Sequence, residues 1–119
     1  MPAAALITDL FFVAKVKGTA DALGVPLVVV RDLEGLTREV RAGAEPVIVD
    51  LNAAGVDPLA AIRACRALPR PPRVIAYLSH VQRELAESAR AAGADLVLPR
   101  SQFSRDLPAI LTGEAEGAD

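Results

Sequence analysis

Five short apolar runs divide the sequence, and each is continuous rather than alternating with polar residues. Continuous runs of this length are typical of strands that are covered on both faces, so the pattern predicts five buried strands. The runs lie at residues 4–8 (AALIT), 26–30 (PLVVV), 46–49 (PVIV), 74–78 (VIAYL) and 96–98 (LVL).

The segments between and after these runs carry apolar residues at helical spacing. The predicted helices begin at Phe12, Leu33, Pro58, Val81 and Ser104, and they end near Gly24, Gly43, Leu68, Gly93 and Leu111. Asp57 is a suitable N-cap ahead of Pro58, and Ser79 with Gln82 forms a candidate capping box for the fourth helix. The last helix, 104–111, is expected to be short. Pro108 would then lie near its first turn, where the missing N–H costs little.

This strict alternation of strands and helices predicts a parallel sheet, because parallel strands need crossover connections. Five such units favour an open α/β sheet that is doubly wound over a closed barrel, which needs eight. We expect one domain over residues 1–112. The acidic segment 113–119 (GEAEGAD) has almost nothing to bury, and we expect it to be disordered.

Composition narrows the class of protein further. The chain has 119 residues, of which 52% are hydrophobic, and a formal net charge of −2, which gives no field for nucleic acid. Cys65 is the single cysteine, so neither an internal disulfide nor a cysteine-based zinc site can form. No apolar run reaches the roughly 18 residues of a membrane span. Asp9 interrupts the first apolar run and no charged segment precedes it, so we expect a cytoplasmic protein with no signal peptide.

Polar residues follow four of the predicted strands. Asp9 follows the first strand, Asp50 the third, Ser79 the fourth and Arg100 the fifth. In open parallel sheets, ligands bind beyond the carboxyl ends of the strands. We therefore expect these four side chains to share one edge of the sheet.

In this order of residues the sequence resembles the receiver domains of bacterial response regulators over about residues 4–111. The best-matching segments are VIVDLNAAGVDPLAAIRACRAL (47–68) and ARAAGADLVLPRS (89–101). The resemblance implies a flavodoxin-like (CheY-like) fold with strand order 2-1-3-4-5. It also implies that Asp50 accepts a phosphoryl group, that Ser79 and Arg100 contact it, and that Asp9 and Asp50 hold Mg²⁺. A carboxylate is a weak nucleophile, so such a transfer depends on positioning and on neutralisation of charge.

The sequence departs from the receiver pattern in three places. Asp9 is followed by Leu10, Phe11 and Phe12 where receivers have a second acid, and two phenylalanines would also make the site drier. Arg100 stands where receivers have a lysine, and Ser101 where a proline usually follows. Mg²⁺ depends on the charge of its ligands, so a site with one acid fewer should bind it weakly.

Two functional hypotheses follow from the resemblance and its departures. The first is an atypical stand-alone receiver-like module that accepts phosphate on Asp50 and works with a histidine kinase or a downstream signalling protein. The second is a pseudo-receiver, a scaffold or interaction protein that needs no phosphate and could be a homodimer. Neither is an enzyme. A small nucleotide-binding enzyme is the weaker third reading, which rests on fold analogy alone.

Each candidate residue also has a structural explanation. Asp50 could be a turn residue, Asp9 and Ser79 helix caps, and Arg100 the partner of Asp9 or Asp50 in a permanent ion pair. His80 could simply start a helix. Three further residues have structural or surface interpretations: Cys65 as a core residue, and Tyr77 and Phe103 as part of an outward face that binds partners.

Overall fold

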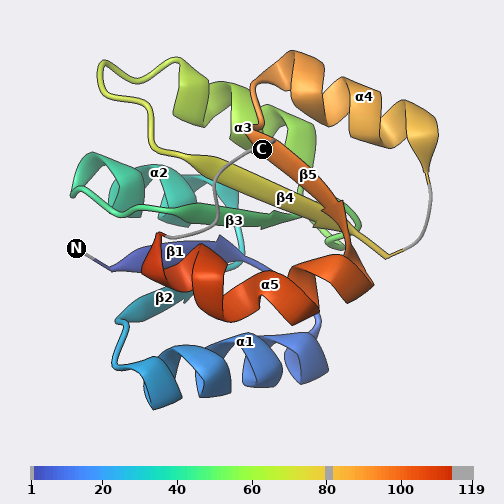
Figure 1. Ribbon diagram of the computed structural model, residues 1–119. Coiled ribbons are helices and arrows are strands. Elements are labelled where there is room, and N and C mark those ends of the chain that lie inside the picture. The colour runs from blue at the N-terminus through green and yellow to red at the C-terminus, as the bar shows by residue number, and fades with distance from the viewer. Residues whose placement is uncertain (1, 80–81, 114–119) are drawn as a thin grey trace.

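The computed structural model describes residues 2–79 and 82–113, which form a five-stranded parallel sheet with helices on both faces (Figure 1). The strand order is β2-β1-β3-β4-β5, as the resemblance predicted. The strands are β1 (Ala3–Leu6), β2 (Leu27–Val30), β3 (Val47–Asp50), β4 (Val74–Leu78) and β5 (Leu96–Pro99), and the helices are α1 (Leu10–Leu23), α2 (Leu33–Arg41), α3 (Pro58–Arg66), α4 (Arg83–Ala92) and α5 (Arg100–Thr112). The doubly wound α/β fold predicted from the pattern is confirmed.

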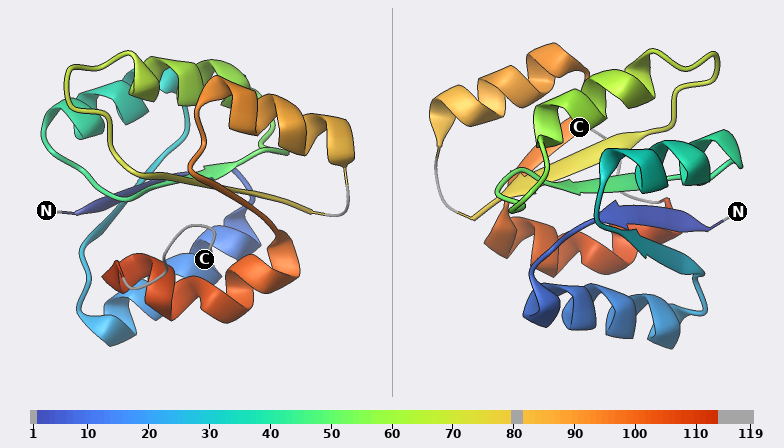
Figure 2. Two further views of the ribbon diagram at one scale, coloured as in Figure 1. Left: turned by 45° about the horizontal axis from the view of Figure 1, so that its top comes forward. Right: turned by 180° about the vertical axis from the view of Figure 1, so that it is seen from behind.

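The helices form two layers. Figure 2 shows α1 and α5 on one face of the sheet, and α2, α3 and α4 on the other. Each face has its own buried apolar cluster, one containing Phe12 and Phe103 and the other containing Leu36 and Ile62. Burial on both faces explains why the strands read as continuous apolar runs. Cys65 is buried in the second cluster, so its core interpretation is confirmed.

All four strand pairs are parallel, so the carboxyl ends of the strands meet at one edge of the sheet. Three helices start at this edge from an aspartate whose side chain accepts backbone N–H groups of the first turn, as N-caps do. These are Asp9, Asp32 and Asp57. Asp57 and Pro58 therefore start α3 as the sequence predicted. The cap role proposed for Asp9 is confirmed as well.

Two predicted helix boundaries were wrong. Helix α4 begins at Arg83 with Gln82 as its N-cap residue, and no side chain caps it, so Ser79 and Gln82 do not form a capping box. Helix α5 begins at Arg100, directly after β5, rather than at residue 104. Pro108 consequently lies inside this helix, and the carbonyl of Ser104 lacks the N–H that another residue would supply.

The described part of the chain ends at the end of α5. Gly113 closes this helix in the left-handed conformation, with φ of 81°, a region that glycine occupies at little cost. The predicted acidic tail falls almost wholly on residues 114–119, which lie outside the described residues. Among the helices that are described, none combines the length and apolarity that a membrane span requires.

Candidate functional site

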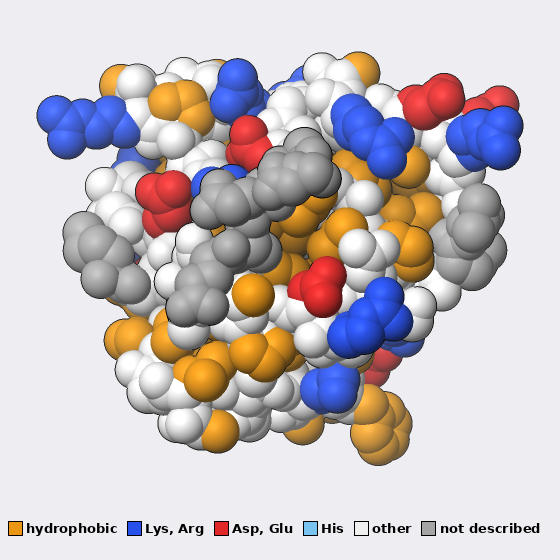
Figure 3. All heavy atoms as spheres, viewed as in Figure 1, with side chains coloured by type: hydrophobic (Ala, Val, Ile, Leu, Met, Phe, Trp, Pro, Cys, Tyr) orange, Lys and Arg blue, Asp and Glu red, His pale blue; other side chains and the backbone are white. Residues whose placement is uncertain are grey.

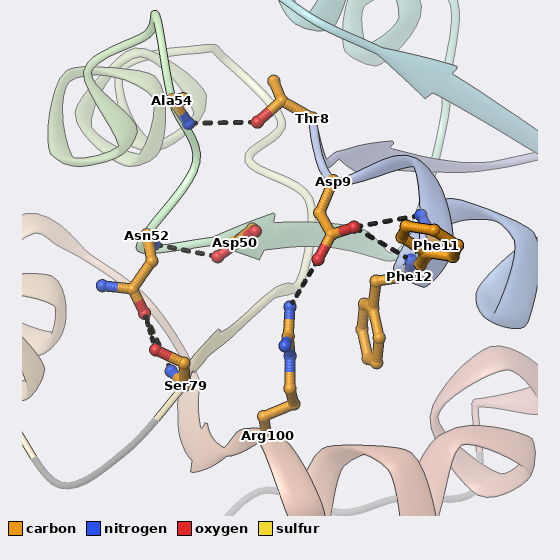
Figure 4. A network of polar contacts seen from close by, with 9 residues as sticks. All are labelled: Thr8, Asp9, Phe11, Phe12, Asp50, Asn52, Ala54, Ser79 and Arg100. Carbon is orange, nitrogen blue, oxygen red and sulfur yellow. Dashed lines mark hydrogen bonds and ion pairs between the residues drawn. The ribbon is translucent and has the colours of Figure 1, made fainter.

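The carboxyl edge of the sheet brings the predicted site residues into one neighbourhood. Figure 4 shows Asp50 between two polar contacts, the Asn52–Ser79 pair on one side and the Asp9–Arg100 pair on the other. Strand register places Asp50 directly opposite Tyr77 on β4. The strand-end residues Asp9, Asp50, Ser79 and Arg100 therefore lie at one edge of the sheet, as the alternating pattern of strands and helices predicted.

Asp9 uses both of its carboxylate oxygens. Its Oδ1 accepts the backbone N–H groups of Phe11 at 3.0 Å and Phe12 at 3.4 Å, which starts helix α1. Its Oδ2 lies 3.3 Å from a terminal guanidinium nitrogen of Arg100, so the two side chains form an ion pair. Asp9 therefore caps a helix and Arg100 forms an ion pair with Asp9, as their structural explanations predicted.

Arg100 lies against the aromatic side chains of the α1–α5 face. Its guanidinium carbon is 4.5 Å from the centre of the Phe12 ring, a distance typical of a cation–π contact. The Nε of Arg100 is buried and has no hydrogen-bond partner among the described residues. The guanidinium is therefore held from one side by a ring and from the other by the Asp9 carboxylate.

Asp50 is the one charged residue that the structure buries among those described, with 4% of its surface exposed. Its Oδ1 accepts the backbone N–H of Asn52 at 2.8 Å. Burial raises the pKa of Asp50, and the Asn52 hydrogen bond and the charge of Arg100 oppose this rise only in part. The charge of Arg100 therefore acts on Asp50 as well, although the ion pair of Arg100 is with Asp9.

Ser79 contacts Asn52, and the N-cap position of α4 is occupied by Gln82. Its backbone N–H and its hydroxyl lie 2.8 Å and 3.0 Å from the Asn52 Oδ1. The Asn52 Nδ2 in turn donates to Gln82 Oε1 at 3.0 Å, so Asn52 ties the end of β3 to the start of α4. Sequence reasoning missed this role of Asn52, although its position two residues after Asp50 was a usable signal. His80 lies outside the described residues.

Tyr77 and Phe103 belong to the core and not to an exposed partner face. Both side chains are fully buried, and their rings stack with centres 4.6 Å apart, while Phe12 lies 5.0 Å from Tyr77. The expectation that Tyr77 and Phe103 contribute to an outward binding face was wrong. The Tyr77 hydroxyl is buried and interacts with Asp50 and Arg100, although it makes no well-formed hydrogen bond among the described residues, and burial raises its pKa.

The donor set at this edge fits Mg²⁺ poorly. Among the described residues, no group of three or more acidic, histidine or cysteine side chains could share a metal ion. Both Asp9 oxygens are engaged, and the Thr8 hydroxyl accepts the N–H of Ala54 at 3.0 Å. Leu10 follows Asp9, where the receiver pattern would have a second acid, and it is 64% exposed. Phe11 is 88% exposed, so of the two phenylalanines only Phe12 keeps the site dry.

Comparisons with known proteins give structural matches only. No family model matches the sequence, and no curated protein matches it significantly. The receiver domain of the response regulator NarL from Mycobacterium tuberculosis is similar, with a TM-score of 0.78 and 16% identity over 94% of this chain and 93% of that one. The phosphorylated cyanobacterial phytochrome response regulator RcpA matches with a TM-score of 0.79 and 12% identity over 99% and 98%. The NtrX receiver domain from Brucella abortus gives 0.77 and 21% over 93% of each chain. The protein therefore has the receiver-domain fold of response regulators.

Proposed function

We propose that the protein is a cytoplasmic signalling module of the receiver type that acts through protein contacts, without phosphorylation of Asp50. The observation that carries this proposal is the engagement of Asp9. One of its oxygens caps α1 and the other pairs with Arg100, so of the two acids predicted for the site, both in the described part of the chain, Asp50 alone is left to attract a metal ion. Mg²⁺ bound by one buried carboxylate would be weakly held.

The physical reason is the charge that accumulates during phosphoryl transfer. A carboxylate that accepts a phosphoryl group needs cations to offset the anionic oxygens of both groups. Here Arg100 is the cation at the site, and its ion pair is with Asp9. Asp50 is also buried, and burial disfavours the further negative charge that a phosphoryl group would bring to this side chain. Both features act against phosphorylation.

Phosphorylation of Asp50 by a histidine kinase is the second candidate. It is supported by the position of Asp50 at the end of β3, with Ser79 following β4 and Arg100 opening α5. In this version a phosphoryl group on Asp50 would draw Arg100 away from Asp9. Mg²⁺ would have to bind at the same edge for the transfer to occur.

Acetyl phosphate and beryllofluoride separate the two candidates. We expect wild-type protein with Mg²⁺ and acetyl phosphate to show no phosphoryl adduct by intact mass, and beryllofluoride to leave its amide NMR spectrum unchanged. The variant Thr8→Asp supplies an acid beside Asp9 that can still accept the Ala54 N–H, and we expect it to gain Mg²⁺ affinity. An adduct on wild-type protein that Asp50→Asn removes would overturn the proposal.

A further inference from the structure

The face opposite the α1–α5 layer carries two adjoining hollows, away from Asp50. One, of about 400 Å³, lies where α2 ends and the loop after α3 begins, and is lined by Val40, Arg41, Leu68, Pro69 and Arg70. The other, of about 460 Å³, runs along α2 and is lined by Glu34, Thr37, Arg38 and Arg41. Both hollows are lined by Arg41, and we call the surface that contains the two of them the α2–α3 groove.

Arginine side chains surround this groove without carboxylate partners. Arg38, Arg41 and Arg70 are all exposed, and among the described residues none of them lies within ion-pair distance of a carboxylate. Figure 3 shows basic side chains protruding at the upper left, over the loop between α3 and β4. Glu34 is the single acid that lines the groove. The groove therefore has an excess of positive charge.

The floor of the groove is partly apolar. Val40 is buried, Leu68 is partly buried against the same core, and Pro69 is exposed beside it. An apolar floor with a rim of guanidinium groups suits an occupant that presents both an apolar side chain and carboxylates. Guanidinium groups bind carboxylates through two parallel hydrogen bonds, which favours arginine over lysine at such a rim.

We propose that the α2–α3 groove binds an acidic peptide segment of a partner protein, with one apolar side chain placed over Leu68 and Pro69. The two hollows share Arg41, so a peptide chain can contact the lining residues of both at once. Nucleic acid fits less well, because Glu34 would oppose its phosphates and no aromatic side chain lines the groove for base stacking. This proposal rests on the protein-contact function proposed above, but not on the state of Asp50.

Fluorescence anisotropy with a labelled peptide, EEDLEEDLEE, tests the groove directly. We expect wild-type protein to bind this peptide, and the double variant Arg41→Glu/Arg70→Glu to bind it about tenfold more weakly or worse, because two favourable charge contacts become repulsive. The matched control is Arg105→Glu on α5, an exposed arginine on the opposite face, which should change binding less than about twofold, since screening at physiological salt limits its reach.

Four further measurements decide the interpretation. Replacing both leucines of the peptide by serine should weaken binding, since the apolar contact is lost. Circular dichroism must show that the charge-reversed variants remain folded, and the single variants replace the double one if it does not. Equal loss with Arg105→Glu, no binding at all, or tighter binding of a single-stranded oligonucleotide would each overturn the proposal. Asp50→Asn should bind the peptide normally, which separates this result from the test of phosphorylation.

Discussion

Replacing Asp50 by asparagine should stabilise the protein at neutral pH. Asp50 is 4% exposed, and its pKa is raised mainly because burial disfavours the charged form. A carboxyl whose pKa is higher in the folded state stabilises the fold at low pH, and this contribution is lost as the pH rises through the folded-state pKa. At neutral pH the wild-type protein therefore bears the cost of a buried charge that asparagine does not have.

The size of the expected gain in stability follows from the interactions of Asp50 that asparagine retains and those that it loses. Asparagine retains an oxygen that can accept the Asn52 N–H, so the 2.8 Å hydrogen bond survives in a weaker, neutral form. It also removes the attraction to Arg100 and the cost of desolvating a charge. Buried charges cost several kcal/mol and charged hydrogen bonds return about 1.5–3 kcal/mol, so we expect a net gain of about 1–2 kcal/mol. For a domain of this size that is a rise in Tm of very roughly 3–10 °C.

Urea unfolding of wild-type and Asp50→Asn protein at several pH values measures this gain. The difference in unfolding free energy should grow as the pH rises above about 4, the ordinary range for an aspartate, and should be smallest below it. Asp57→Asn is the matched control, because Asp57 is exposed and asparagine also caps helices well. A variant that is less stable than wild type at neutral pH would refute the reasoning, since Asp50 would then be held by favourable contacts.

Three other substitutions or reactions test features of the fold. Tyr77→Phe removes a buried hydroxyl that makes no well-formed hydrogen bond among the described residues but interacts with Asp50 and Arg100, so thermal unfolding should show a change of less than about 1 kcal/mol in either direction, and a larger loss would reveal a strong hydrogen bond. Gly93→Ala should cost about 2 kcal/mol or more in chemical unfolding, because Gly93 has φ of 122° and an added Cβ would overlap the Arg66 side chain. Burial raises the pKa of the Cys65 thiol to about 11, so iodoacetamide should label it only when the protein unfolds, and rapid labelling of folded protein would contradict this.

The fold could be predicted from the sequence because its signals are local and repeated. Continuous apolar runs mark strands buried on both faces, and Asp57 with Pro58 marks the start of α3. The start of α5 could not be predicted in the same way. No capping side chain precedes Arg100, and Pro108 suggested a boundary that packing of Phe103 and Leu107 overrides. Tertiary burial decided this helix, as it often does where local signals are weak.

The site was only partly predictable, for a different reason. The rule that ligands collect at strand ends located Asp9, Asp50, Ser79 and Arg100, because backbone topology alone fixes where strands end. Which of these side chains form an ion pair depends on how far each reaches across the sheet. The sequence alone did not determine whether Arg100 would pair with Asp9 or with Asp50. Asn52 was overlooked because an amide after a strand usually signals a turn, and its contacts with Ser79 and Gln82 span 27 and 30 residues of the chain.

The ion pair between Arg100 and Asp9 is not strong enough by itself to keep Arg100 away from Asp50. Both side chains are more than one-third exposed, and such pairs contribute about 0–1 kcal/mol. The contact with the Phe12 ring adds about 0.5–1 kcal/mol. A dianionic phosphoryl group on Asp50 could outweigh this total and recruit the arginine.

Arginine cannot, however, bridge the acceptor and the incoming oxygens as a metal ion does. The feature that limits phosphorylation is therefore the missing second acid beside Asp9. Removing Arg100 alone should leave the site unreactive, whereas Thr8→Asp is the change expected to make it responsive.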